Sequence, residues 1–302
     1  MTMAPEVTVV VPTRNRRDMV RATLRSIREQ ASIPVCVVVV DEASTDGTVE
    51  WLERLGDDDV RIVRHSEPRG VAAARNSGLD VVETRWVAFC DDDDLWAPDK
   101  LSAQLDALET SEARWCCGGS VMVDADLAIV DHQRAINGDV VDALLSMNIV
   151  PGGGSGVVAE AAFVREVGGF DESLRNNEDW DLWIRLAQRS PIVGVDRPLV
   201  AYRMWEGSKS RDLSRMLVAW ETITARYSSR FRKHIGVHDG SVDGMQTFDD
   251  ELEKLWQQQV NSKETALAYA SNPTNLALRL TDDNAPTPAK ESEDESMLSM
   301  LE

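Results

Sequence analysis

The N-terminal hundred residues alternate between short apolar runs and segments with helical spacing, and this alternation constrains the fold most. Val7–Thr13 (VTVVVPT) and Pro34–Asp41 (PVCVVVVD) are continuous apolar runs, typical of strands buried on both faces. Between them, Val20, Leu24 and Ile27 recur at spacings of four and three, which predicts one apolar face of a helix. Such alternation requires a mostly parallel sheet with right-handed crossovers and helices on its faces, an α/β fold.

The same patterns continue along the chain. Further strands are predicted at Val60–His65, Trp86–Cys90, Trp115–Asp124 and Pro198–Trp205. Further helices are predicted around Val49–Leu55, Val71–Val82 and Leu101–Leu108, from near Glu178, and at Leu213–Phe231 and Asp249–Ala270. The glycine-rich Pro151–Gly156 is expected to be an irregular loop.

Three segments are expected along the 302 residues: an α/β domain over 1–210, a helical extension over 211–271, and an acidic tail over 272–302. From Asp282 to Glu302 there are seven acidic residues and one lysine, with proline and serine, a composition typical of disorder. The short Ser296–Leu301 (SMLSML) is an apolar exception that could dock on a partner or on the enzyme itself.

Charge and composition exclude several functions. The net charge of −20 argues against binding to nucleic acid and to anionic membranes, both of which need basic surface. No apolar stretch reaches the length of a membrane-spanning helix, and the N-terminus lacks the pattern of a secretion signal. Three of the four cysteines lie in apolar, strand-like runs, which predicts reduced thiols and a cytoplasmic location.

Four consecutive aspartates, Asp91–Asp94, follow the predicted strand Trp86–Cys90 and raise the question of what compensates their charge. In parallel sheets, ligands bind beyond the carboxyl ends of the strands, where Thr13 and Asp41 also lie. Carboxylates there suit Mg²⁺ or Mn²⁺ bound together with phosphate oxygens of a nucleotide or diphosphate. A solvated acidic turn is the plainer alternative. Because the chain contains neither GxxxxGK[ST] nor a GxGxxG after the first strand, P-loop and dinucleotide folds are disfavoured.

Six motifs in order resemble the family 2 glycosyltransferases of the GT-A fold. They are VVVPTRNR, VVVVDEASTDGT, GVAAARNSGL, FCDDDDLW, VGGFDESL and NEDWDLWIRL, and together they cover roughly Val7 to Tyr202. The resemblance implies an αβα sandwich and a nucleotide-diphosphate sugar as donor, with a UDP-sugar expected. It also implies transfer of the sugar with inversion at its anomeric carbon.

The resemblance also implies roles for individual residues on the donor side. Asp91 and Asp93 match the metal-binding DxD motif, with Asp93 as the direct ligand of Mn²⁺ or Mg²⁺ and Asp91 near the ribose or sugar. Asp92 is expected to orient the loop within the donor site, and Asp94 to reach sugar hydroxyls. Asp41 matches the residue that binds the base ring. Pro12, Thr13 and Arg14 match the loop under the nucleotide, and Arg75 matches a nucleotide or diphosphate contact, with an ion pair to Asp80 or Asp91 as the alternative.

On the acceptor side, Asp179 matches the family's catalytic base, and Glu178 is the next candidate. An acceptor hydroxyl is a weak nucleophile at neutral pH and needs a positioned base. Asp181 lies about 200° around the helix from Asp179, so the two cannot face one substrate. Alternatively, Glu178 and Asp179 only complement the dipole at a helix N-terminus.

One segment departs from the family pattern. Many members carry a histidine after the last core strand, as an additional metal or diphosphate contact, whereas this chain reads YRMWEGSKS with Trp205 at that place. The resemblance therefore implies metal dependence less firmly than it implies the donor class. Trp205 could stack on a sugar or base ring of the donor, or be an ordinary buried tryptophan.

Two other functions remain open from the sequence. Nucleotidylyl transfer uses a similar sheet and similar metal carboxylates, although its usual glycine-rich basic loop is missing from PTRNRRDM. A non-catalytic sugar-nucleotide-binding module would use the helices after Asp212 to recruit a partner. The acceptor and the oligomeric state are not indicated by the sequence.

Overall fold

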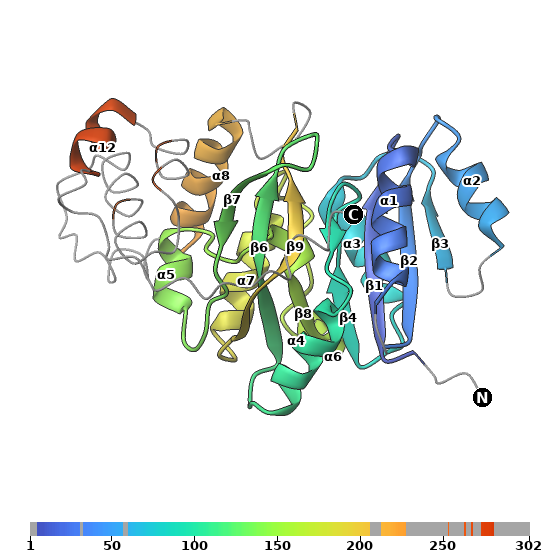
Figure 1. Ribbon diagram of the computed structural model, residues 1–302, viewed down its shortest axis with the longest axis horizontal. Helices are drawn as coiled ribbons and strands as arrows, with labels where there is room; N and C mark the ends of the chain where they lie inside the picture. Colours follow the sequence, from blue (N-terminus) through green and yellow to red (C-terminus); the bar gives the residue numbers. More distant parts are fainter. Residues whose placement is uncertain are drawn as a thin grey trace.

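The computed structural model describes residues 5–30, 33–56, 60–205, 213–227 and 273–280, together with residues 253, 263 and 267. Within this part of the chain a single nine-stranded sheet runs through the molecule, with helices against both of its faces (Figure 1). The α/β architecture predicted from the alternation of strands and helices is therefore confirmed.

The sheet has the order β3-β2-β1-β4-β8-β6-β9-β5, and β7 pairs with β6 outside this path. Its strands are β1 (Val7–Thr13), β2 (Val35–Glu42), β3 (Val60–His65), β4 (Trp86–Phe89), β5 (Leu95–Trp96), β6 (Trp115–Val123), β7 (Ile129–Gln133), β8 (Val157–Glu160) and β9 (Val193–Arg203). The first four strands are mutually parallel, as predicted. Strand β8 runs antiparallel to both β4 and β6, so the second half of the sheet is mixed.

The helices divide between the two faces. They are α1 (Arg17–Arg28), α2 (Thr48–Leu55), α3 (Val71–Asp80), α4 (Lys100–Glu109), α5 (Val141–Ser146), α6 (Ala161–Glu166), α7 (Glu178–Ala187), α8 (Leu213–Arg226) and α12 (Pro273–Arg279). Val9 and Val11 of β1 pack into one core with α1 and α4, whereas Val10 packs into the other core with α3 and α7. Because successive side chains of a strand point to opposite faces, the unbroken valine run supplies both cores.

Several elements were not expected from the sequence. Strands β5, β7 and β8 and helices α5 and α6 are all short, and β9 begins earlier than the predicted Pro198. The glycine-rich loop contains a 3₁₀ turn, η1, over Gly153–Gly156. This turn matters for the site because Ser155 reaches the acidic run.

A buried lysine, Lys100, supports the η1 turn through Gln104. Lys100 lies over the ring of Trp96, 3.9 Å from its centroid, and its Nζ donates to Oε1 of Gln104 at 2.7 Å. Gln104 in turn donates to the carbonyl of Gly156 at 2.9 Å. No part of Lys100 is accessible to solvent, and this burial lowers the pKa of its ammonium group to about 7.

Replacing Lys100 by methionine is expected to stabilise the protein at pH 8. The pKa of a lysine in an unfolded chain is about 10.4. Between about pH 7 and pH 10, Lys100 is therefore neutral in the folded chain and protonated in the unfolded chain. Stability of the wild type should therefore rise with pH between about 7 and 10, and the variant should gain up to about 3 kcal/mol at pH 8. Urea unfolding at pH 8 and 10 measures this gain. A variant less stable than the wild type at pH 8 would contradict the argument.

The C-terminal segments are described only in part. Helix α8 lies in the predicted extension, and almost all of the second predicted helix, 249–270, lies outside the described residues. Helix α12 falls where the tail was predicted to begin, and its Leu276 and the following Leu280 are fully buried. Charge and prolines averaged over residues 272–302 concealed this leucine pair, so a helix at Pro273–Arg279 was not predicted. Residues 281–302, including Ser296–Leu301, lie outside the described residues.

Among the described helices, none combines the length and the apolarity that crossing a bilayer requires.

Candidate active site

A cavity of about 430 Å³ opens at the carboxyl ends of β1, β2 and β4. Register pairs Thr13 of β1 with Asp41 of β2, so the polar residues that end these strands lie side by side. The start of α3, the start of α7 and the end of β9 complete the walls. Of the predicted site residues, the cavity is lined by Pro12, Thr13, Arg14, Arg75, Asp91, Asp92, Asp93 and Glu178. Asp41, Asp179 and Trp205 flank this lining without belonging to it.

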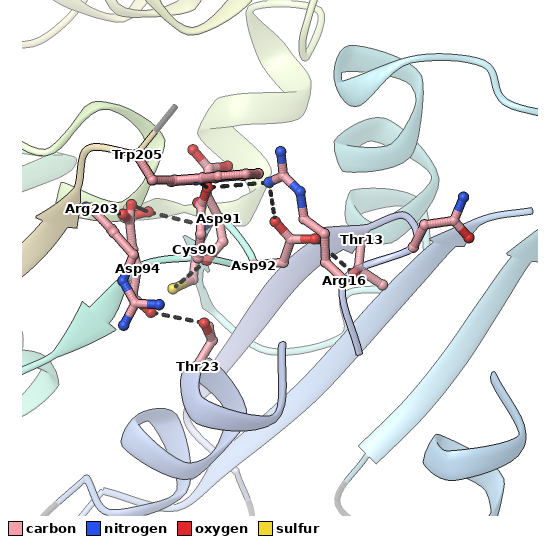
Figure 2. Close-up of polar contacts among 12 residues, drawn as sticks. Thr13, Arg16, Thr23, Cys90, Asp91, Asp92, Asp94, Arg203 and Trp205 are labelled. Atoms are coloured by element: carbon pink, nitrogen blue, oxygen red, sulfur yellow. Dashed lines mark hydrogen bonds and ion pairs between the residues drawn. The ribbon is translucent and has the colours of Figure 1, made fainter. Parts of the chain in front are cut away.

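Three of the four aspartates, Asp91 to Asp93, line the cavity, and the four differ in burial. The side chains of Asp92 and Asp94 are buried, whereas the Asp91 side chain is 30% exposed and that of Asp93 is 13% exposed. Figure 2 shows the run surrounded by partners from β1, α1, β9 and Trp205. Neighbouring elements therefore supply the hydrogen-bond and ion-pair partners of the run.

Asp92 anchors the end of β1 and the start of α1. Its Oδ2 accepts a hydrogen bond from Oγ1 of Thr13 at 2.7 Å, and its Oδ1 accepts one from Nη1 of Arg16 at 2.7 Å. Burial raises the pKa of Asp92 to about 6 although Arg16 opposes the shift. Both oxygens are thus occupied, which fits the predicted role of Asp92 in orienting the loop.

Asp94 lies inside the protein and does not reach the cavity. Oδ2 accepts from Oγ of Ser155 at 2.5 Å, Oδ1 accepts from the backbone N–H of Arg203 at 3.0 Å, and the Asp94 carbonyl accepts from Thr23. Burial raises the pKa of Asp94 well above its ordinary value. The expected contact with sugar hydroxyls is wrong, because this carboxyl ties β9 and η1 to the acidic run.

Asp91 and Asp93 are the more exposed carboxylates of the acidic run. Oδ1 of Asp91 accepts from Nη2 of Arg75 at 2.5 Å. Oδ2 of Asp93 accepts from Nε1 of Trp205 at 2.9 Å and from Nη1 of Arg16 at 3.2 Å. Burial, with the charge of Asp91 beside it, raises the pKa of Asp93. Each carboxylate uses one oxygen for these contacts, so the other oxygen of each could serve a hard divalent cation.

The described residues contain no group of three His, Cys, Asp or Glu side chains that would hold a metal on its own. Two carboxylate oxygens beside a cavity nevertheless fit the way Mg²⁺ and Mn²⁺ are bound, with one or two carboxylates and phosphate oxygens of the ligand. Asp91 and Asp93 therefore fit such an ion together with a diphosphate.

Arg75 joins the acidic run to the first turn of α7. Its guanidinium is 3% exposed and donates from Nη2 to Asp91 and from Nη1 to Oε1 of Glu178 at 2.7 Å. Burial alone would lower the pKa of Arg75, but the charges of Asp91 and Glu178 outweigh it and raise that pKa. The alternative predicted for this residue, an ion pair with Asp91, is the contact present. A Cβ on Gly154 would approach Nη2 to 2.9 Å, so the loop is glycine where it covers this guanidinium.

The first turn of α7 presents Glu178 and Asp179 toward the site. Asp179 is partly exposed, and its Oδ1 accepts from the backbone N–H of Trp180 at 2.7 Å. Burial, with Glu178 and then Asp91 adding negative charge, raises the pKa of Asp179 to about 6. A carboxylate with this pKa is ionised at neutral pH and can still accept a proton, as a general base requires.

Asp181 faces the opposite side of α7, as its helical spacing predicts. It is 1% exposed and is held by Arg185, Arg226 and the hydroxyl of Tyr227. This carboxylate therefore fastens α8 to α7 and takes no part in the cavity.

Asp41 ends β2 beside the cavity with one oxygen satisfied. Oδ2 accepts from the backbone N–H of Ser44 at 3.0 Å, while the buried Oδ1 has no hydrogen-bond partner among the described residues. A buried acceptor without a donor is costly unless a ligand supplies one. The adjacent Glu42 lines the cavity but is engaged with the backbone N–H groups of Arg69 and Gly70 at the start of α3.

The sequence indicated Glu42 only as a polar strand end at this edge. It assigned no site role to the remaining lining residues, which are Arg16, Pro68, Gly70, Val71, Arg175, Tyr202 and Arg203. Arg16 could have been found, because four adjacent carboxylates need a nearby cation and β1, which it follows, pairs with β4. Arg175 lies in the loop before α7, and no sequence signal distinguished it from an ordinary surface arginine.

Comparison with known proteins gives consistent results. Residues 8–150 match the family described as Glycosyl transferase family 2. The chain is 29% identical over 211 residues to the putative teichuronic acid biosynthesis glycosyltransferase TuaG of Bacillus subtilis, covering 68% of this chain and 82% of TuaG. It is also 29% identical over 106 residues to the Escherichia coli glucosyltransferase WfaP, covering 35% of this chain and 42% of WfaP.

Solved structures share the fold. S. aureus TarS 1–349 in complex with UDP-GlcNAc superposes with a TM-score of 0.59 at 17% identity, covering 88% of this chain and 84% of that one. Mannosyltransferase PcManGT from Pyrobaculum calidifontis, in complex with GDP-Man and Mn²⁺, gives a TM-score of 0.56 at 21% identity, covering 94% and 83%. At these identities the likeness establishes the fold, and the predicted GT-A class is confirmed.

Proposed function

We propose that the chain, whose residues 8–150 match glycosyl transferase family 2, is a member of that family and transfers a sugar from a nucleotide-diphosphate sugar to an acceptor hydroxyl with inversion. One observation carries the proposal: a single cavity has Asp91 and Asp93 on one wall and, on another, Glu178 of the α7 turn that also bears Asp179, and Arg75 bridges the two walls. Donor activation and acceptor deprotonation need two such groups of carboxylates close together.

On the donor side, the base ring is proposed to lie against Asp41. The unpaired Oδ1 of Asp41 would accept an N–H from the base, which a uracil ring offers, so we keep a UDP-sugar as the expected donor. Pro12, Thr13 and Arg14 form the floor below the nucleotide. UDP-GlcNAc is the ligand named in the TarS complex and GDP-Man that in the PcManGT complex, so the base of this chain's donor is left to experiment.

Asp91 and Asp93 are proposed to hold a divalent metal, Mn²⁺ or Mg²⁺, with the donor diphosphate. When bound, such an ion supplies Lewis-acid stabilisation of the negative charge on the leaving diphosphate. The chain's own contribution is to aim the two carboxylates: Arg75 fixes Asp91, and Trp205 with Arg16 fixes Asp93. Trp205, expected to stack on a ring of the donor or to be buried, is half-buried and instead donates its indole N–H to this carboxylate.

On the acceptor side, Asp179 is proposed to take the proton of the attacking hydroxyl. Its raised pKa is matched to that task, and it lies in the first turn of α7 next to Glu178, which Arg75 holds. Glu178 is held by Arg75 and is better suited to orienting the turn than to accepting a proton. The thiols of Cys90, Cys116 and Cys117 are buried and form no disulfide, which suits a reducing compartment, and we propose a cytoplasmic location on that ground.

The function is tested by incubating the protein with UDP-sugars and GDP-sugars, each with Mn²⁺ or Mg²⁺, and measuring thermal shift and nucleotide release. A true donor at 100 times its dissociation constant should add about 2.7 kcal/mol of apparent stability. Transfer to water or to an added acceptor separates an enzyme from a binding module, and NMR of the product anomer tests inversion. Absence of nucleotide release with every donor would contradict the proposal.

Asp93→Ala is expected to remove the metal-dependent part of donor binding. The substitution deletes the predicted direct ligand while leaving the buried Asp92 and Asp94 with their partners. Donor affinity measured by calorimetry with Mn²⁺ should fall by at least about tenfold, to the value found without metal. Asp126→Ala, at an exposed turn, is the control. Unchanged affinity with Mn²⁺ present would show that Asp93 is not a ligand.

A further inference from the structure

Besides Arg75 on Asp91, a second cation of the protein itself contacts the acidic run. Nη1 of Arg16 lies 2.7 Å from Oδ1 of Asp92 and 3.2 Å from Oδ2 of Asp93. The guanidinium also lies near the ring of Trp205, 5.0 Å from its centroid (Figure 2). The indole N–H of Trp205 donates to the same oxygen of Asp93. The guanidinium of Arg16 therefore contacts Asp92, Asp93 and Trp205.

We infer that Arg16 is a resident counter-cation of Asp92 and Asp93, so that a divalent metal binds tightly only when it arrives with the nucleotide diphosphate. The inference rests on the proposed metal-bound donor and adds a residue that the family resemblance did not assign. Trp205, at the place where a histidine was expected, serves in it as a positioning residue for Arg16.

Two observations lead to this conclusion. First, a metal ion bound to Asp93 would lie close to the positively charged guanidinium of Arg16. Two positive charges a few ångströms apart repel each other strongly in a partly buried site. Second, no described group of three metal-binding side chains exists, so a free ion gains at most two carboxylates here. Diphosphate oxygens supply both the missing ligands and the negative charge that offsets Arg16.

The ion pair between Arg16 and Asp92 is also needed when neither metal nor donor is bound. Asp92 is buried and would carry an uncompensated charge without Arg16, since its other oxygen is already bonded to the neutral hydroxyl of Thr13. Arg16 is thus anchored by Asp92 and only shared with Asp93. A metal entering with the donor can take Asp93 while Arg16 stays on Asp92.

Calorimetric titration of Mn²⁺ into the full chain, with and without UDP, tests the inference. Arg16→Gln keeps a hydrogen-bond donor for Asp92 but removes the charge, and should tighten Mn²⁺ binding without UDP by about tenfold. Arg16→Lys, which keeps the charge, should bind Mn²⁺ as the wild type does. Arg21→Gln, an equal loss of charge at an exposed position of α1, is the matched control. With UDP present, the difference between Arg16→Gln and the wild type should shrink.

Unchanged Mn²⁺ affinity in Arg16→Gln, or an equal gain in Arg16→Lys, would overturn the inference. If Arg16→Gln does not fold, Trp205→Ala decides instead. Removing the ring that covers the guanidinium should tighten Mn²⁺ binding several-fold, and no change would be equally decisive against it. Because the readout is metal binding and not sugar transfer, failure of every donor in the transfer assay would remove the proposed function without changing this result.

Discussion

Asp179→Asn is expected to lower the turnover of sugar transfer by about 10²–10⁴-fold, the range typical for loss of a general base. Asparagine keeps the size of the side chain and can still accept the backbone N–H of Trp180, but it cannot take a proton. Donor affinity should change little, because the side chain does not line the donor cavity. Steady-state turnover and donor titration in the same variant provide the two measurements.

The pH profile supplies a second readout for Asp179. Its carboxyl must be ionised to act, and its pKa is raised to about 6 by burial and by Glu178. Turnover of the wild type should therefore rise with pH through about 6 and level off above it, whereas the residual turnover of Asp179→Asn should lack this rise.

Glu178→Gln is the comparison that locates the base. Glutamine can still accept from Arg75, so the turn stays in place and turnover should fall far less than in Asp179→Asn. Near-normal turnover in Asp179→Asn with a large loss in Glu178→Gln would move the base to Glu178. Equal losses of donor affinity and turnover in Asp179→Asn would make Asp179 a donor-side or structural residue.

The first half of the fold could be predicted because its signals are local. A valine run such as Val7–Thr13 identifies a doubly buried strand, and the spacing of Val20, Leu24 and Ile27 identifies the helix that covers it. The second half lacked such signals. Strand β8 is four residues long and follows a glycine-rich turn, and its antiparallel pairing with β4 and β6 depends on residues far away in sequence.

The candidate site shows the same division. The sequence placed Asp91, Asp93 and Asp41 at one edge because parallel strands end together. It could not show that Asp94 points inward, since that depends on Ser155 and on the backbone of Arg203, 61 and 109 residues away. Nor could it pair Trp205 with Asp93 across 112 residues. Packing between distant elements determines contacts of this kind, and they produce no periodic residue pattern in the sequence.

Arg75→Met is expected to destabilise the fold by about 3–5 kcal/mol, the usual result of removing one partner from a buried ion pair. Arg75 is 3% exposed, and Glu178 beside it is 9% exposed, so the carboxylate left behind cannot be rescued by water. Asp91 is 30% exposed, so leaving its carboxylate without Arg75 costs less free energy. Urea unfolding at pH 7.5, followed by circular dichroism, measures the loss.

Arg69→Met serves as the matched control, because Arg69 on the preceding turn forms a half-exposed pair with Glu172 that should contribute no more than about 1 kcal/mol. The double variant Arg75→Met/Glu178→Gln removes the stranded charge and should recover part of the loss, whereas two independent sites would simply add. If the double variant regains stability but not turnover, then Arg75 is needed to hold the first turn of α7, which carries Asp179, against Asp91. If Arg75→Met unfolds at the same urea concentration as the wild type, the bridge contributes nothing to the fold, and its two contacts must be explained by function alone.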